Sequence, residues 1–371
     1  SPTGLKSSLL NIAMLSLILV GCVQAPSTFK DAYADKFLVG TAVSVDALNN
    51  DPAAMQLVKE QFNTVVAENC MKSGEIQAVE GEFDFTEADK LMDFALENGI
   101  VPTGHCLVWH SQAPSWFFTD SEGNLVTPEV LTQRMKTHIY TVVEHFKGKV
   151  TGWDVVNEAF EDDGSYRQSM FYRILGPDYI KMAFRFAQEA DPNVELYYND
   201  FNMYKEGKRN AVVKLIRELK AEGLRIDAIG MQAHIGLTWP EKWSDFENSI
   251  KAFAAEGCQV MLTELDMTVL PDNSTSAAID RRGEYSKEVN PYPDELPDSI
   301  YQLEAQRYDE LFDILLRNHE KISRVTFWGI NDGYSWRNDW PIEGRTDYPL
   351  LVDRNNRLKP ITEQMFKKAI K

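Results

Sequence analysis

Two stretches of the sequence end an apolar run with a glutamate. In residues 150–160, which read V-T-G-W-D-V-V-N-E-A-F, the apolar core stops at Asn157 and Glu158. A second stretch, Q-V-M-L-T-E-L-D-M, stops at Glu264 and has Asp266 two residues later. A strand buried on both faces is a nearly continuous apolar run, and parallel sheets carry their working groups at the carboxyl ends of such strands. Two carboxylates on one rim could supply the acid/base and the nucleophile that hydrolysis of a glycosidic bond needs.

Short apolar runs alternate with longer amphipathic runs along the chain. The runs typical of strands are Leu38 to Val43, Thr64 to Ala67, Val101 to His105, Gly152 to Val156, Glu195 to Asn199, Ala228 to Gln232, Val260 to Thr263 and Val325 to Trp328. The runs typical of helices include Asp89 to Asn98, Pro128 to Phe146, Asp178 to Ala190, Lys208 to Glu222, Glu241 to Ala255 and Ile300 to His319. Strands that alternate with helices predict a parallel sheet, and eight such units close a barrel. We therefore expect one α/β domain with the fold of a (β/α)8 TIM barrel.

Composition excludes several classes of function. The chain has 371 residues, 44% of them hydrophobic, and a net charge of -18, which would repel phosphate backbones and anionic lipid surfaces. We therefore expect no nucleic-acid partner. The six histidines do not form an H-E-x-x-H motif, and neither G-x-S-x-G nor a Gly-rich phosphate loop occurs. No metal and no cofactor are expected.

The first residues have the pattern of a signal peptide. Lys6 precedes an apolar run from Leu9 to Val20, and the sequence L-V-G then leads to Cys22. This ending resembles the lipobox of bacterial lipoproteins, with cleavage before Cys22 and lipidation of its thiol; an ordinary secretory signal cut a few residues later is the alternative. We expect residues 1–22 to be the signal, 23–36 a tether, and 37–371 the catalytic domain. Val23 mildly favours the outer membrane or the cell surface for an anchored protein, and the alternative is a secreted or periplasmic soluble one.

Two further features lie outside the alternation of strands and helices. The polar stretch from Pro271 to Ser299 is long for a loop in a compact domain, and we interpret it as a βα loop over the catalytic face. The cysteines other than Cys22 lack metal-type spacing, and an odd number cannot all be paired. Cys70 and Cys106 both follow predicted strands and could form one bridge.

Polar and aromatic side chains follow most of the predicted strands. They are Glu68, Asn69, Lys72, His105, Trp109, His110, Asn157, Glu158, Asn199, Gln232, His234, Glu264, Asp266, Trp328 and Trp336. Barrel interiors prefer Val, Ile and Leu, so this convergence on one rim indicates a site. Amides, imidazoles and an ammonium suit a ligand rich in hydroxyls, and flat Trp faces suit sugar rings.

These residues occur in motifs that resemble glycoside hydrolase family 10. The motifs, in order, are E-N-C-M-K at 68–72, G-H-C-L-V-W-H at 104–110, W-D-V-V-N-E-A at 153–159, Q-A-H at 232–234, T-E-L-D at 263–266 and T-F-W-G at 326–329. The resemblance runs from about Phe37 to the end of the chain. It implies a retaining endo-β-1,4-xylanase on a (β/α)8 barrel that acts on xylan and xylo-oligosaccharides.

The resemblance also implies a role for each central residue. Glu158 would be the acid/base and Glu264 the nucleophile, and the charge of Glu264 would raise the pKa of Glu158. Asn157 would bind the 2-hydroxyl of the sugar. His234 would orient Glu264, and Asp266 would fix the imidazole.

The remaining motif residues are implied as substrate contacts. Glu68, Asn69, Lys72, His105, Trp109 and Gln232 would bind the glycone side, with Trp328 and Trp336 as aromatic walls. Taken singly, His105 could be a core histidine, Trp109 packing and Lys72 a surface charge. Weaker candidates are His110, Trp116, Tyr204 and Trp239, and Trp153 is more consistent with packing.

Two other interpretations of the same residues stay open. The barrel and the carboxylate pair could act on mixed-linkage glucan or aryl glycosides, because related sugars fit hydrogen-bonding subsites. A surface carbohydrate-binding module without catalysis is the alternative from another class of function. We expect a monomer that meets a membrane only through its lipid anchor.

Overall fold

The fold is described from a computed structural model, which covers residues 24–272 and 288–371. The predicted signal peptide, its lipobox and Cys22 lie outside the described residues, as does the middle of the predicted loop at 271–299. In the described part of the chain, no helix combines the length and the apolar character needed to cross a membrane.

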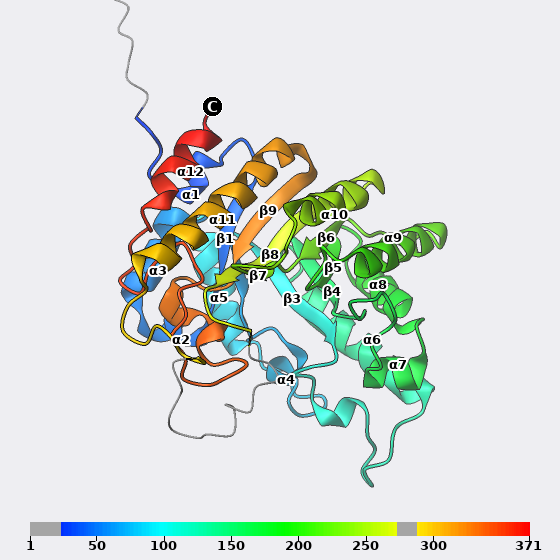
Figure 1. The fold of residues 1–371 in the computed structure, drawn as a ribbon. Helices are drawn as coiled ribbons and strands as arrows, with labels where there is room; N and C mark the ends of the chain where they lie inside the picture. Colours follow the sequence, from blue (N-terminus) through cyan, green and yellow to red (C-terminus); the bar gives the residue numbers. More distant parts are fainter. Residues whose placement is uncertain (1–23, 273–287) are drawn as a thin grey trace, which may run out of the picture.

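Eight parallel strands close into the expected barrel. Its strands are β1 (Leu38–Val43), β2 (Thr64–Ala67), β3 (Val101–Trp109), β4 (Gly152–Asn157), β5 (Glu195–Asp200), β6 (Ala228–Met231), β8 (Gln259–Thr268) and β9 (Ile322–Phe327). From β1 to β6 each strand pairs with the next, β6 pairs directly with β8, β8 pairs with β9, and β9 pairs with β1 to close the barrel. The short β7 (His234–Gly236) pairs with the far end of β8. The chain is therefore a (β/α)8 barrel, as the sequence predicts (Figure 1).

Helices surround the barrel on its outside (Figure 1). They are α1 (Phe29–Ala32), α2 (Val45–Asn50), α3 (Pro52–Gln61), α4 (Ser73–Ile76), α5 (Thr86–Glu97), α6 (Pro128–His145), α7 (Met170–Leu175), α8 (Tyr179–Ala190), α9 (Glu206–Ala221), α10 (Trp243–Ala255), α11 (Asp298–Arg317) and α12 (Ile361–Ala369). The six helices predicted from periodicity are confirmed, because each presents an apolar stripe to the strands. In α6, the Thr127 side chain caps the first turn and Pro128 occupies its start, where a missing N–H costs nothing.

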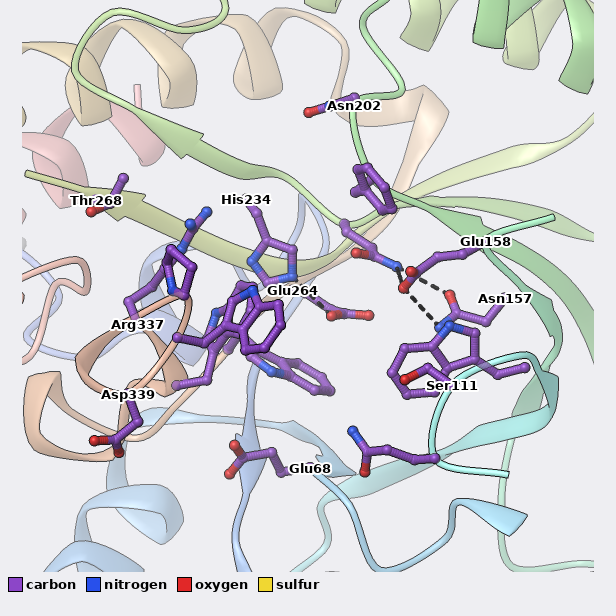
Figure 2. A pocket seen from close by; sticks show the side chains of 18 of the residues that line it. Glu68, Ser111, Asn157, Glu158, Asn202, His234, Glu264, Thr268, Arg337 and Asp339 are labelled. Atoms are coloured by element: carbon purple, nitrogen blue, oxygen red, sulfur yellow. Dashed lines mark hydrogen bonds and ion pairs between the residues drawn. The ribbon is translucent and has the colours of Figure 1, made fainter. Parts of the chain in front are cut away.

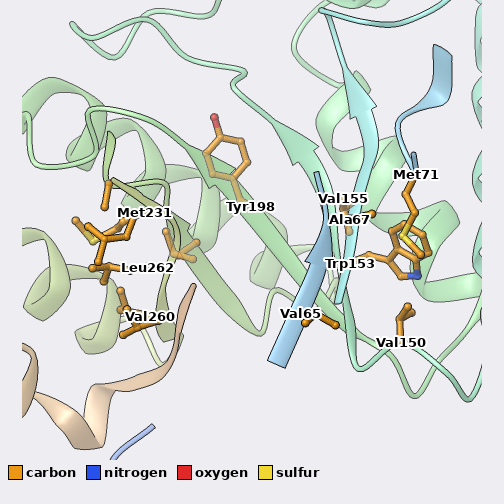
Figure 3. Close-up of a cluster of buried hydrophobic side chains, with 14 of the residues drawn as sticks. Val65, Ala67, Met71, Val150, Trp153, Val155, Tyr198, Met231, Val260 and Leu262 are labelled. Atoms are coloured by element: carbon orange, nitrogen blue, oxygen red, sulfur yellow. The ribbon is translucent and has the colours of Figure 1, made fainter. Parts of the chain in front are cut away.

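The main core lies between the strands and the helices. Figure 3 shows part of it, with aliphatic side chains such as Val155 and Leu262 fully buried. Trp153 is also fully buried, and its ring packs so close to Gly104 that a Cβ there would lie 2.3 Å from a ring carbon. The prediction of a packing role for Trp153 is thus confirmed.

The packed fold begins earlier than the predicted boundary at residue 37. Phe29 in α1 is completely buried, stacks on Phe62 at a centroid distance of 5.6 Å and meets Phe366 of α12 edge-on at 5.0 Å. Tyr33 is buried as well. The predicted tether at residues 23–36 therefore includes residues of the packed fold, because Phe29 and Tyr33 bury their aromatic rings against the barrel.

Two strands run past their predicted ends, and a third was not predicted. β3 and β8 contain register shifts against their neighbours and continue to the rim of the barrel. The extension of β8 allows β7 to pair with it, with His234 opposite Asp266. β7 is only three residues long and follows Ala233, whose φ is 63°. A strand this short has no alternating apolar pattern from which it could be predicted.

The cysteines of the described chain are not bridged. Cys70, Cys106 and Cys258 are free thiols, and the last two are buried. The bridge between Cys70 and Cys106 that the sequence left open does not form.

Candidate active site

A cleft of about 830 Å³ opens at the carboxyl ends of the strands. All of the predicted substrate-contact residues line it, together with Asn157, Glu158, His234 and Glu264. Asp266 does not line the cleft and is fully buried behind His234. Of the weaker candidates, His110 and Trp239 line the cleft, whereas Trp116 and Tyr204 do not.

Glu264 lies in the middle of the cleft with a donor on each carboxylate oxygen (Figure 2). His234 Nε2 lies 2.9 Å from Oε1, and Asn199 Nδ2 donates to Oε2 at 3.0 Å. The side chain is almost completely buried, with 6% of the residue exposed. Two donors on a buried carboxyl favour its ionised form.

His234 lies between two carboxylates. Its Nδ1 is 2.9 Å from Asp266 Oδ1, and its Nε2 faces Glu264. Burial alone would lower the pKa of the imidazole, but the charge and hydrogen bond of Asp266, followed by those of Glu264, raise it to about 9. At neutral pH the ring is therefore an imidazolium that donates to both carboxylates. Trp336 contacts both His234 and Asp266. Its Nε1 donates to Asp266 Oδ2 at 2.8 Å, and its ring centre lies 4.8 Å from that of the His234 imidazole.

The pKa of Glu264 is held below its ordinary value. Burial would raise it, but the hydrogen bond from His234, together with the nearby His105 and Lys72, outweighs the cost of desolvation. Glu264 is consequently a carboxylate over the neutral pH range, which is the state a nucleophile needs.

Glu158 has different surroundings. Both of its amide donors meet one oxygen, since Asn157 Nδ2 and Gln232 Nε2 donate to Oε2 at 3.1 and 3.0 Å. Within residues 24–272 and 288–371, no hydrogen bond to Oε1 accompanies these two. Figure 2 shows Glu158 on the opposite side of the cleft from Arg337.

The backbone at Glu158 is held in an unusual conformation. Its φ is 58°, a region that residues other than glycine rarely adopt and that is typical of functional sites. Three hydrogen bonds fix it: Glu158 N–H donates to Asn199 O at 2.9 Å, Arg167 Nε donates to Glu158 O at 2.9 Å, and Ala159 N–H donates to the Tyr198 hydroxyl at 2.9 Å.

A buried ion pair lies behind this backbone. The Tyr198 hydroxyl donates to Asp200 Oδ2 at 2.6 Å, and Lys208 Nζ lies 3.0 Å from Asp200 Oδ1, with both charged side chains fully buried. Burial raises the pKa of Glu158 most, and the negative charge of Asp200 is the next cause. The charge of Glu264 also raises this pKa, in the direction that the sequence analysis expects, but it ranks below burial and Asp200 among the causes.

Three amides join the two glutamates. Asn157 Oδ1 accepts from Asn199 Nδ2 at 3.0 Å and from Gln232 Nε2 at 3.1 Å. Asn199 also donates to Glu264, and Gln232 also donates to Glu158. A continuous chain of hydrogen bonds thus runs from one carboxyl to the other.

Three polar residues that follow β2, Glu68, Asn69 and Lys72, line one part of the cleft. Lys72 Nζ donates to Asn69 Oδ1 at 2.7 Å and lies 4.9 Å from the ring centre of Trp109. Burial, opposed by Lys72 and assisted by Glu264, raises the pKa of Glu68 to about 7. Lys72 is buried rather than a solvated surface charge.

His105 lines the cleft and also contacts a residue of the barrel interior. Its Nδ1 is 2.7 Å from Asp154 Oδ2, and its ring meets the ring of Trp328 edge-on at 5.5 Å. Both aromatic residues line the cleft. The alternative of a core histidine was therefore partly right, since Asp154 is buried inside the barrel.

Several residues of the site were not singled out from the sequence. Tyr198, Asp200 and Lys208 look like strand or surface residues in an apolar or charged run, and Arg167 lies in a polar loop. Asp200 could have been found from its position, because it is a charged residue at the carboxyl end of β5, where the site residues of the other strands lie. The described chain contains no cluster of His, Cys, Asp and Glu arranged to hold a metal ion.

Comparison with known proteins gives a consistent match. The sequence pattern of glycosyl hydrolase family 10 matches residues 28–368. A protein named endo-1,4-β-xylanase A, from Xylanibacter ruminicola, is 49% identical over 359 residues, which cover 96% of this chain and 97% of that protein. An endo-1,4-β-xylanase A from Thermotoga maritima is 42% identical over 337 residues, or 89% of this chain, and the match spans 30% of that longer protein.

Solved structures with the same architecture agree. A family 10 endoxylanase retrieved from a sugarcane soil metagenome superposes with a TM-score of 0.87 at 39% identity, covering 93% of this chain and 100% of that one. Xylanase B from Clostridium stercorarium F9 gives a TM-score of 0.83 at 38% identity, covering 91% and 98%. With a barrel whose cleft gathers the predicted motifs, and a match that extends from α1 to α12, this chain belongs to glycosyl hydrolase family 10.

Proposed function

We propose that this protein is an endo-1,4-β-xylanase that cleaves internal bonds of xylan with retention of anomeric configuration. The observation that carries the proposal is the unequal pair of glutamates in one cleft. Glu264 accepts hydrogen bonds on both oxygens and has a lowered pKa, whereas Glu158, among the described residues, accepts them on Oε2 alone and has a raised pKa. Relatives named endo-1,4-β-xylanase supply the substrate class.

In the first step, a Glu264 oxygen attacks the anomeric carbon of the sugar. The bond from that carbon to the glycosidic oxygen breaks, and the oxygen leaves with the electron pair and takes the proton from Glu158. The products are a glycosyl ester of Glu264, a carboxylate at Glu158 and a shortened xylan chain. The free Oε1 of Glu158 is the oxygen suited to deliver this proton.

In the second step, water completes the hydrolysis. Esterification removes the charge of Glu264, which is one cause of the raised pKa of Glu158, so that pKa falls. Glu158 can then accept a proton from the water that attacks the anomeric carbon. The ester bond breaks, and Glu264 returns to its carboxylate form.

Three residues support these steps in the proposal. The imidazolium of His234, fixed by Asp266, holds Glu264 in its ionised form and orientation. Asn157 Nδ2 faces Glu158, and its remaining N–H could donate to the sugar 2-hydroxyl. That contact strengthens in a transition state with oxocarbenium character.

The sugar-binding residues divide between hydrogen bonding and stacking. Glu68, Asn69, Lys72 and Gln232 offer carboxyl, amide and ammonium groups to hydroxyls, and Trp109, Trp328 and Trp336 offer flat apolar faces. His105 completes the floor beside Trp328.

Purified protein should release short oligosaccharides from linear xylan by internal cleavage. Product analysis by chromatography, with proton NMR of the newly formed reducing end, should show xylo-oligosaccharides that appear first as the β anomer. Cleavage of mixed-linkage glucan but not of xylan would refute the substrate, and first appearance of the α anomer would refute retention.

Azide should distinguish the two glutamates. In Glu264→Gly, turnover of an aryl β-xylobioside should nearly vanish, and azide should restore it in part by attacking from the side of the missing carboxylate, giving the α-glycosyl azide. In Glu158→Ala, hydrolysis of xylan should fall by about 10²–10⁴-fold. An activated aryl substrate should still form the glycosyl ester in this variant, and azide should then give the β-glycosyl azide. The opposite pair of products would exchange the two roles.

The buried Asp200 should set the alkaline limit of activity. Glu158 must be protonated at the start, so kcat/KM falls as pH rises through its pKa. Asp200→Asn removes a negative charge that disfavours the carboxylate of Glu158, so the pKa should fall and the alkaline limb of kcat/KM should move to lower pH.

Lys208 needs to be considered in the same test, because Asp200→Asn leaves a buried ammonium without its partner. The double variant Asp200→Asn with Lys208→Met removes both charges and should shift the limb in the same direction by a smaller amount, because the ammonium that partly offsets the Asp200 charge is lost as well. Asp162→Asn is the matched control, since Asp162 also pairs with Lys208 at 3.4 Å but is not a cause of the Glu158 shift. An unchanged alkaline limb in the folded double variant would contradict the assignment.

We also propose that the protein is exported and anchored through a lipid on Cys22, on the basis of the L-V-G-C sequence. Cys22→Ala should then move the protein from the membrane fraction of the cell to the soluble fraction. Membrane association that survives this change, or cleavage at a later residue by mass spectrometry, would favour an ordinary secretory signal.

A further inference from the structure

Trp340 is an unusually exposed aromatic residue at the edge of the cleft. It is 62% exposed, more than the other large hydrophobic side chains on the surface of the described chain, and it is the aromatic one among them. Isolated exposed apolar side chains are common and do not by themselves indicate a binding site. Trp340 differs from Leu303, Leu125 and Val79, because it lines the cleft and they do not.

The loop that carries Trp340 is firmly held. In residues 336–345, here called the rim loop, Trp340 N–H donates to Trp336 O at 3.0 Å and Arg345 N–H donates to Asn338 O at 2.8 Å. The Asn338 amide donates to Asp332 O at 2.9 Å, and its oxygen accepts from Asp347 N–H at 2.8 Å. The indole is thus displayed on a fixed backbone.

The rim loop is also tied to the catalytic centre. Trp336, at its first position, donates to Asp266 and packs on His234. Figure 2 shows Arg337 and Asp339 of the same loop on the side of Glu264 away from Glu158. The position of Trp340 relative to the reacting sugar is therefore set by the same contacts that fix the nucleophile.

The cleft offers room beyond the two sugars at the scissile bond. Its volume of about 830 Å³ lies near the upper end for ligand pockets, and its lining includes both Trp109 and Trp340. Arg337 and Asp339, which line the cleft beside Trp340, can exchange hydrogen bonds with sugar hydroxyls. A flat apolar face with polar neighbours is the combination that suits a sugar ring.

We propose that Trp340 forms an outer subsite, on which a xylose ring of the bound polymer stacks beyond the residues that flank the scissile bond. The proposal rests on the proposed action on xylan and adds a residue that selects for chain length. A preformed face on a fixed loop loses little conformational entropy when a sugar binds.

The test compares a long and a short substrate. Trp340→Ala should lower the ratio of kcat/KM for xylohexaose to kcat/KM for xylotriose by about tenfold, as expected for loss of one aromatic stacking contact, mainly through KM. Trp340→Tyr should restore most of the ratio, because it keeps an aromatic face. Leu303→Ala is the control, since Leu303 is a comparably exposed apolar residue on α11 outside the cleft.

A binding measurement separates this proposal from the proposed function. In the Glu264→Ala background, calorimetry should show weaker xylohexaose binding when Trp340 is also replaced by alanine. If the wild type binds xylohexaose through Trp340 but hydrolyses no xylan, the subsite stands and the function fails. An unchanged ratio, or an equal loss on both substrates as expected from a disturbed Trp336, would overturn the subsite. A change in oligomeric mass with no change in the ratio would overturn it in favour of a protein contact.

Discussion

The proposed mechanism requires two buried carboxyl groups in one cleft to hold opposite protonation states, and the surroundings of the two groups differ accordingly. Burial alone pushes both pKa values upward. The hydrogen bond from His234 reverses the effect at Glu264, whereas the buried charge of Asp200 reinforces it at Glu158. Asp266 makes the first effect possible, because it keeps the imidazole charged. In the proposed mechanism, this difference prepares Glu264 to attack and Glu158 to give a proton.

The barrel supplies these surroundings because parallel strands end on one rim. Asn157, Asn199 and Glu264 come from three strands, yet their side chains share hydrogen bonds. The hydrogen bonds that run from Glu158 through the amides to Glu264 restrict the side-chain rotation of both carboxyl groups. The positive φ of Glu158, held by Arg167 and Asn199, presents its side chain at the point where the strand stops.

The sequence predicts much of this because strand ends and periodic helices are local features. Apolar runs locate the eight barrel strands, and the residues that follow them gather in the cleft. What it could not predict depends on contacts between distant segments. Lys208 looks like a solvated helix residue until Asp200 is placed beside it, and Phe29 looks like part of a tether until Phe366 covers it. The two leading causes of the raised Glu158 pKa, burial and the charge of Asp200, also depend on the packing of distant segments and have no local sequence pattern.

The central claim is that the two glutamates differ in protonation before substrate binds. Carbon-13 NMR of the labelled Glu158 and Glu264 carboxyl carbons, followed through a pH titration of the free protein, measures this directly. The account predicts that Glu264 titrates below the ordinary range of a glutamate and Glu158 above it, and that Glu158 titrates at lower pH once Glu264 is trapped as a stable glycosyl ester. Titration of Glu264 above Glu158, or no response of Glu158 to the ester, would contradict it.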